Sequence, residues 1–161
     1  MQFLASPILG SLSDRFGRRP VLLVSLLGAA VDYLFMALAP TFGWLFFGRI
    51  ISGLTGASIT VASAYMSDLA NASGDEHGHS ANFGLIGAAF GLGFILGPVL
   101  GGVFGGYDAK LPFYIAMVLN FANFLFGLLV LPESLPKSKR RKISLAGINP
   151  FSSIVKLFSA K

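Results

Sequence analysis

Long apolar stretches, separated by short polar or glycine-containing segments, occupy residues 1–132. A bilayer core about 30 Å thick needs roughly 20 apolar residues in a helix that rises about 1.5 Å per residue. Four stretches have this length, and we expect each to cross a membrane: residues 20–39, 44–66, 83–106 and 113–131. The pattern therefore predicts four helical spans in a single transmembrane bundle.

A fifth apolar stretch, residues 1–12, has only about half the length of a span. It lacks the basic start and the small-residue cleavage site of a secretory signal, and it ends abruptly at Ser13-Asp14-Arg15. We therefore expect the inner half of a helix whose outer half is absent, so that the chain is a fragment of a longer protein or the product of a mis-started gene.

Basic residues gather at two places outside the spans. One cluster, Arg15, Arg18 and Arg19, precedes the first full span. The second follows the fourth span and comprises Lys137, Lys139, Arg140, Arg141 and Lys142. Four spans between the clusters place both on the same side of the membrane, which the positive-inside rule makes cytoplasmic. Residues 133–161 are accordingly predicted to be a basic cytoplasmic linker, and residues 67–82 a polar cytoplasmic loop.

Composition agrees with a membrane protein and argues against other classes. Hydrophobic residues make up 54% of the 161 residues and charged residues 12%, whereas a soluble domain carries about 25% charged residues. The mean hydropathy is +0.74. The absence of cysteine excludes a disulfide scaffold and a cysteine nucleophile. The net charge of +5 is explained by cytoplasmic loops facing anionic lipid, so a nucleic-acid partner is not predicted.

Two charged residues lie within predicted spans. An ionised Asp32 there costs on the order of 2.5–3.5 kcal/mol, so we expect it to face the bundle interior. Arg49 lies on the next span at a similar depth from the outer side, so the two side chains could pair directly or through water. Arg49 could instead extend to the outer headgroups, and Asp32 could be a protonated acid packed between helices.

Residues 10–19, GSLSDRFGRR, are dense in charge and glycine. An ordinary cytoplasmic loop would account for the charge alone. The spacing, however, resembles the signature G-x-x-x-D-R-x-G-R-R between the second and third helices of the major facilitator superfamily, at every defined position. The resemblance implies an inside gate that latches this helix pair to a helix of the other half-molecule and is formed by Gly10, Asp14, Arg15, Gly17, Arg18 and Arg19.

Residues 48–56, GRIISGLTG, resemble the fourth-helix motif of the same superfamily. The arginine of that motif is implicated in proton coupling, which assigns this role to Arg49 by resemblance, with Asp32 as its candidate partner. Asp68 follows at the inner end of the same span. It could be a helix cap, a part of the gate or a solvated surface carboxylate.

The span at residues 83–106 is rich in glycine. Its small residues would serve simple helix packing, and Pro98 should kink the helix because it removes a backbone hydrogen bond. A more specific resemblance is to the fifth-helix antiporter motif of proton-driven drug exporters. The matching positions are Gly84, Gly93, Gly97, Pro98, Gly101 and Gly102.

Other polar residues carry weaker signals. His77 and His79, beside Asp75 and Glu76, lack a preorganised third ligand, so neither a metal site nor a cofactor is predicted. Asn120 and Asn123 are expected to hydrogen-bond between helices, with substrate contact as the alternative. Both histidines share one polar loop and no nucleophile-bearing turn is present, so the chain is not predicted to be an enzyme.

The fold class predicted is an all-α polytopic membrane helix bundle, part of the six-helix N-terminal half of a major facilitator transporter. With the sequences AAVDY and INPFSS, the chain most resembles the tetracycline/proton antiporters of the bacterial inner membrane. The resemblance implies proton-driven efflux of a drug such as tetracycline by alternating access. The implied partners are the drug, protons, the lipid bilayer and either the missing C-terminal half or a second copy. A transport-incompetent remnant, or a membrane partner of a separate half-transporter, remains the alternative.

Overall fold

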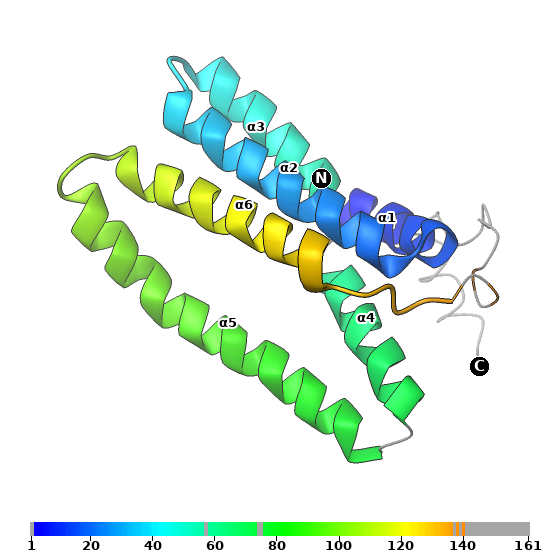
Figure 1. Cartoon of the computed structure of the whole chain (residues 1–161). Helices are drawn as coiled ribbons and strands as arrows, with labels where there is room; N and C mark the ends of the chain where they lie inside the picture. Colours follow the sequence, from blue (N-terminus) through cyan, green and yellow to red (C-terminus); the bar gives the residue numbers. More distant parts are fainter. Residues whose placement is uncertain (1, 57, 74–75, 137, 139, 141–161) are drawn as a thin grey trace, which may run out of the picture.

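The computed structural model describes residues 2–56, 58–73, 76–136, 138 and 140. In this part of the chain the regular structure is α-helical throughout and forms six helices (Figure 1). Their bounds are α1 Gln2–Phe16, α2 Arg18–Leu38, α3 Phe42–Thr55, α4 Ser58–Ser73, α5 Glu76–Gly105 and α6 Leu111–Val130. The predicted all-α fold is therefore confirmed.

Among the described residues, three helical segments are long and apolar enough to cross a membrane: Arg18–Leu38, Phe83–Gly105 and Leu111–Val130. Their ends follow local sequence signals. α2 stops two residues before Pro40, and α6 carries Pro112 in its first turn, where a missing backbone N–H costs nothing. α5 runs through Pro98 as one helix of 30 residues.

The stretch expected to form one span, residues 44–66, is divided between α3 and α4. The helix ends where glycines weaken it: α3 stops at Thr55, and Gly56 is its C-cap. The Thr55 hydroxyl donates a hydrogen bond to the Ile51 carbonyl, 2.9 Å away, in competition with the backbone ladder. Local chemistry thus breaks a segment whose hydropathy alone predicts a continuous helix.

Residues 67–82, expected to be a polar loop, are helical over most of their length. α4 continues to Ser73 and α5 begins at Glu76. Ala70 is buried, and Asp68 forms an ion pair with Arg18 on α2. These tertiary contacts extend α4 beyond the apolar stretch, because they stabilise helical turns that hydropathy alone leaves undecided.

α2 is the central helix, in contact with α1, α3, α4 and α6 (Figure 1). Its apolar window is 44% buried. Small and medium-sized side chains on α2 permit this close packing, and the buried positions are Val21, Leu22, Ser25, Gly28, Ala30, Asp32 and Ala37. The hydrophobic core consists of Val21 and Leu22 against Val61 and Tyr65 of α4.

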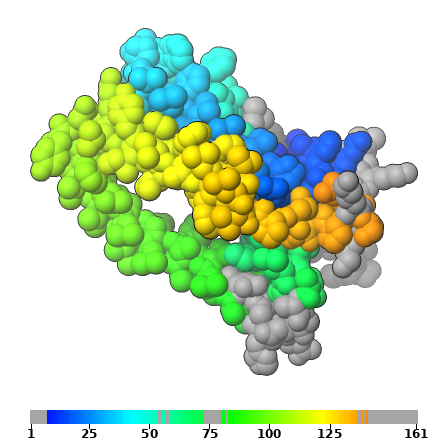
Figure 2. Space-filling view, in the orientation of Figure 1, coloured from blue at the N-terminus to red at the C-terminus, as the bar shows by residue number. Residues whose placement is uncertain are grey.

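α5 is packed much less closely. It contacts α4 at one end and α6 at the other, and its middle stands away from α6 (Figures 1 and 2). None of its apolar window is buried within the described residues. Side chains such as Phe94 and Ile95 are therefore exposed on it.

Packing at Gly28 provides a test of the central helix. A Cβ at this position would lie within 2.6 Å of three side-chain atoms of Thr55, and Thr55 is too short to move aside cheaply. We expect Gly28→Ala to lower the free energy of unfolding by about 1–3 kcal/mol, the usual cost of overpacking. The measurement is circular dichroism during SDS titration of the chain in detergent micelles.

Gly91→Ala on α5 is the matched control, because a Cβ there meets nothing within 4 Å in the described chain. This change should leave the stability equal or raise it by up to about 1 kcal/mol, as alanine favours helix over glycine. Equal effects of the two substitutions would contradict the assigned α2–α3 packing.

Candidate functional site

The turn between α1 and α2 is a tight reversal made by one glycine. Gly17 has φ 112°, a backbone conformation that residues with a side chain rarely adopt. Its N–H donates to the Ser13 carbonyl at 3.1 Å, which closes the last turn of α1, and α2 starts at the next residue. The second glycine of the predicted signature is therefore required by the backbone geometry.

Arg18, the first residue of α2, is the centre of a charged network. Its guanidinium contacts the Asp14 carboxylate at 2.5 Å and donates from Nε to Asp68 Oδ2 at 3.1 Å. It also donates to the Ser13 hydroxyl at 2.6 Å. The Arg18 side chain is only 12% exposed, so these charge-assisted bonds compensate for the loss of water around the cation.

The structure adds Glu133 to this network, a residue that we placed in a surface linker. Its Oε1 accepts a hydrogen bond from the Arg18 backbone N–H at 2.8 Å and another from the Leu135 N–H at 3.1 Å. Its Oε2 lies 3.8 Å from the Arg140 guanidinium. One sequence signal could have suggested such a partner: the first turn of α2 contains Arg18 and Arg19 but no acidic residue.

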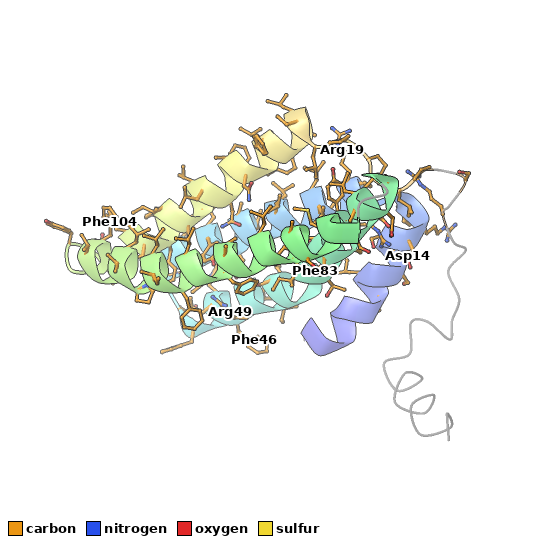
Figure 3. All side chains as sticks on the ribbon, turned by 90° about the horizontal axis from the view of Figure 1, so that it is seen from below. Asp14, Arg19, Phe46, Arg49, Phe83 and Phe104 are labelled. Carbon is orange, nitrogen blue, oxygen red and sulfur yellow. The ribbon has the colours of Figure 1, made fainter. Side chains whose placement is uncertain are left out.

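Gly10 joins this network through its carbonyl, which accepts a hydrogen bond from the Ser13 hydroxyl at 2.7 Å, whereas Arg15 and Arg19 lie apart from it. Arg19 donates to the Leu128 carbonyl of α6 at 2.6 Å, and Arg15 stacks over the Phe16 ring at 5.4 Å. A Cβ at Gly10 would meet nothing within 4 Å among the described residues. Figure 3 shows that Asp14 and Arg19 lie at the same end of the bundle, remote from Phe104 at the far end of α5.

Asp32 and Arg49 approach each other between α2 and α3. Arg49 Nη2 lies 3.9 Å from Asp32 Oδ2 and also donates to the Met36 sulfur. Asp32 is 3% exposed, and its Oδ1 has no hydrogen-bond partner in the described part of the chain. A Cβ at Gly48 would lie 2.8 Å from that oxygen, so glycine there makes room for the carboxylate.

The predicted antiporter motif on α5 makes no close contact within the described residues. A Cβ would meet nothing within 4 Å at any of its glycines, Gly84, Gly93, Gly97, Gly101 and Gly102. The flat face that these glycines form is thus available to a further helix. Pro98 lies inside α5 and does not interrupt it.

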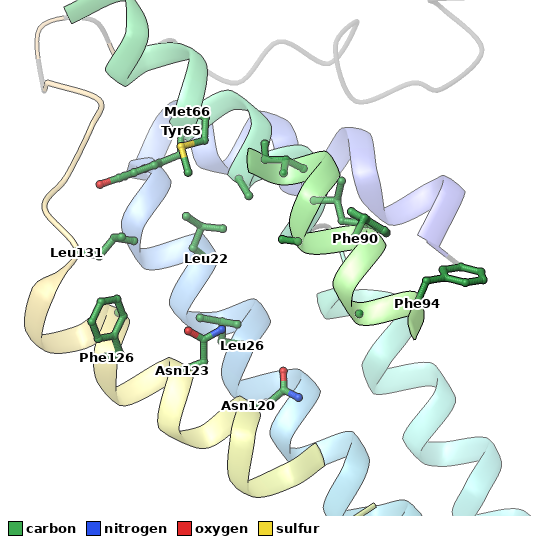
Figure 4. Close-up of a pocket in the computed structure, with 16 residues that line it drawn as sticks. Leu22, Leu26, Tyr65, Met66, Phe90, Phe94, Asn120, Asn123, Phe126 and Leu131 are labelled. Carbon is green, nitrogen blue, oxygen red and sulfur yellow. The ribbon is translucent and has the colours of Figure 1, made fainter. Parts of the chain in front are cut away.

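A cavity of about 930 Å³ lies between α5 and the rest of the bundle, with walls from α2, α4, α5 and α6 (Figure 4). Aromatic side chains of α5 and α6, such as Phe90 and Phe126, face it together with Asn120 and Asn123. The expected bond between helices is not found at Asn120, whose amide donates to the Ala116 carbonyl of its own helix at 2.8 Å. The cavity is therefore mainly apolar, with two amides on the α6 wall.

Within the described residues, no group of three or more His, Cys, Asp or Glu side chains is placed to bind a metal. Of the four residues considered for such a site, Asp75 lies outside the described residues. Glu76, His77 and His79 belong to the backbone of α5, and their side chains also lie outside the description.

A helical bundle with three helices able to cross a membrane, charges held between its helices and a partly polar cavity is typical of membrane transporters. A sequence profile of the Major Facilitator Superfamily matches residues 1–161. The chain belongs to this superfamily. Since the family consists of transporters, the prediction that the chain is not an enzyme is confirmed, as is its place in a membrane.

Relatives confirm the resemblance to the tetracycline resistance proteins. The class C tetracycline resistance protein of Escherichia coli is 49% identical over 153 residues, which is 95% of this chain and 37% of that protein. The class B protein of Escherichia coli is 47% identical over 125 residues, 78% of this chain and 30% of that protein. The chain thus spans about a third of the length of these curated relatives.

A solved structure has the same arrangement of helices. The human organic anion transporter MFSD10 matches with a TM-score of 0.81 and 33% sequence identity. The match covers 91% of this chain and 34% of that protein. The helix bundle described here is therefore part of a major facilitator fold.

The two glycines of the turn signature are predicted to differ in their tolerance of a side chain. Gly17→Ala should lower the free energy of unfolding by about 1–3 kcal/mol, because φ at this position is 112°. Gly10→Ala, inside α1 and without a neighbour within 4 Å in the described chain, should be neutral or stabilising by up to about 1 kcal/mol. SDS titration in micelles measures both. A destabilising Gly10→Ala with a neutral Gly17→Ala would contradict the turn geometry.

Proposed function

We propose that the chain supplies part of the N-terminal half of a proton-driven drug antiporter, with a tetracycline-class compound as its substrate. The relatives named as tetracycline resistance proteins support the substrate class. The mechanism would be alternating access, in which two halves rock about a central site. The bilayer is the bacterial inner membrane, and both basic clusters lie on its cytoplasmic side.

The observation that carries this proposal is the burial of Asp32. A carboxylate that is 3% exposed within a membrane-spanning helix is expensive to keep charged. One of its oxygens lacks a partner in the described residues, and its ion pair with Arg49 is long at 3.9 Å. A loosely paired acid of this kind can take up and release a proton as the surrounding helices move, which is the requirement for proton coupling.

The Arg18 network supports the proposed inside gate. Asp14, Arg18 and Asp68 join α1, α2 and α4 at one end of the bundle through short bonds. Breaking and remaking such bonds between discrete arrangements is how gates of transporters alternate. We assign the residues Gly10, Asp14, Arg15, Gly17, Arg18 and Arg19 to this gate, and the glycines of α5 to the contact that the rest of the transporter makes with this half.

A second candidate is favoured by the exposure of α5. None of its apolar window is buried in the described chain, and its glycine face meets no neighbour there. These features suit a membrane partner that associates with a separate half-transporter, or a remnant that does not transport alone. A measurement of tetracycline uptake into membrane vesicles that contain only this chain separates these two functions from transport by the chain alone.

Inverted membrane vesicles that contain this chain should take up tetracycline when a proton gradient is imposed. The uptake should collapse with a protonophore and fall at least about tenfold in Asp32→Asn, because the amide cannot carry the coupled proton. Radiolabelled tetracycline uptake measures the rate. Tyr33→Phe is the matched control, because it removes a polar group from the same helix and belongs neither to the charge pair, nor to the proposed gate, nor to the cavity lining.

The absence of uptake, with the chain shown to be inserted, would reject autonomous transport. Uptake that appears only when the remaining helices of a relative are co-expressed would support the half-transporter role. A chain that remains inactive under both conditions would support the remnant.

Pairing of Asp32 with Arg49 is tested by charge removal. Asp32→Asn or Arg49→Gln alone should impair transport and weaken tetracycline binding by about tenfold or more, because each leaves one charge unpaired within the membrane. The double substitution should restore substrate binding relative to either single change, since no lone charge remains. Equilibrium binding of tetracycline to the detergent-solubilised transporter measures this recovery. An additive loss in the double variant would exclude the pairing.

A further inference from the structure

We propose that Glu133 is a positioning residue of the turn between α1 and α2: it caps α2 from another part of the chain and thereby fixes Arg18 between Asp14 and Asp68. The residues 131–136, here called the post-α6 segment, bring the carboxylate to the turn. Its importance for gating rests on the function proposed above, whereas its role in fixing the turn does not.

The N-terminus of α2 needs an anion that its own sequence does not provide. The first turn of the helix contains Arg18 and Arg19 and no acidic residue, and its N-cap, Gly17, makes no side-chain capping bond. The free N–H groups and the helix dipole make this end positive, and two arginines add to the unfavourable potential. The Glu133 carboxylate supplies both the missing acceptor, at 2.8 Å from the Arg18 N–H, and the missing charge.

Gly17 leaves the space that this carboxylate occupies. A Cβ at position 17 would overlap with the carboxylate of Glu133 and lie 2.9 Å from the Arg140 guanidinium. The glycine therefore meets two independent requirements, its φ of 112° and the close approach of Glu133. This accounts for the second glycine of the turn signature by a contact with a residue far outside the signature.

The post-α6 segment is held in place by further contacts on both sides of Glu133. The Tyr65 hydroxyl donates to the Pro132 carbonyl at 3.0 Å, and the Ser134 hydroxyl lies 3.4 Å from Asp68 Oδ2. Leu135 is 8% exposed. Asp68 thus contacts both Arg18 and Ser134, so the turn and the post-α6 segment share one polar network.

A consequence follows for movement at this end of the bundle. The Arg18 side chain could leave Asp14 and Asp68 by moving alone, without any change in its backbone. A displacement of the α1–α2 turn as a body must instead release Glu133 and the post-α6 segment. The chain beyond α6 is therefore mechanically coupled to the turn that carries the predicted gate.

The experiment uses the absence of cysteine in the sequence. The chain carrying Leu135→Cys is labelled with a maleimide in detergent micelles, and the labelling rate reports release of the post-α6 segment. Pro136→Cys, exposed in the native chain, gives the rate for an accessible thiol. Ala70→Cys, buried on α4, reports wider unfolding.

Two substitutions of similar size and shape isolate the role of the carboxylate. Glu133→Met removes the acceptor of the Arg18 and Leu135 N–H groups and the charge beside Arg140. We expect labelling at position 135 to accelerate by at least about tenfold, the ratio that corresponds to about 1.4 kcal/mol. Glu133→Gln keeps a neutral acceptor for the Arg18 N–H, so its rate should lie between those of Met and Glu. Position 70 should stay protected in both.

An unchanged rate at position 135 in Glu133→Met would overturn the proposal. If Glu133→Met also exposes position 70, the Glu133→Gln variant decides. Labelling at position 135 that is faster than in the native chain, with position 70 still protected, supports the role of the charged cap. Labelling at the native rate overturns it. None of these outcomes requires transport, so failure of the proposed antiport function leaves this test intact.

Discussion

The Arg18 guanidinium is the interaction on which this end of the bundle depends. The cation is 12% exposed and lies between Asp14 of α1 and Asp68 of α4. Removing either carboxylate would take one of two charged partners from a cation with little access to water, which costs more than a surface ion pair is worth. Because Arg18 begins α2 and its partners come from α1, α4 and the segment after α6, these elements are held in one arrangement.

Asp32, between α2 and α3, is also a buried charged group that needs a partner, but its pairing is weaker than that of Arg18. Asp32 is buried against α3, but its contact with Arg49 is 3.9 Å and Arg49 remains 57% exposed. Gly48 provides space beside the carboxylate and no donor. The two sites therefore differ in their contacts: Arg18 pairs closely with two carboxylates, whereas Asp32 has one long ion pair and an oxygen, Oδ1, without a hydrogen-bond partner in the described residues.

Packing within the bundle is uneven for a reason that follows from the membrane. In lipid, helices gain no hydrophobic driving force by associating, so close packing depends on small residues and hydrogen bonds. α2 has both, and Gly28 lies directly against Thr55. α5 has the glycines but no partner for them in the described chain, and the chain spans about a third of its curated relatives. The glycine face of α5 is therefore exposed, and the cavity lies between α5 and the rest of the bundle.

The sequence by itself determined the helical membrane fold, because apolar runs of about 20 residues have no other stable form in a bilayer, and the spacing of residues 10–19 indicated the superfamily. It also identified Asp32 and Arg49 as charges within the membrane that could pair, since desolvation penalties follow from residue type and depth. Only the tertiary structure decided the 3.9 Å separation of Asp32 and Arg49 and the part played by Glu133. That last contact joins residues 115 positions apart, and no local pattern encodes a bond that forms only when separate helices meet.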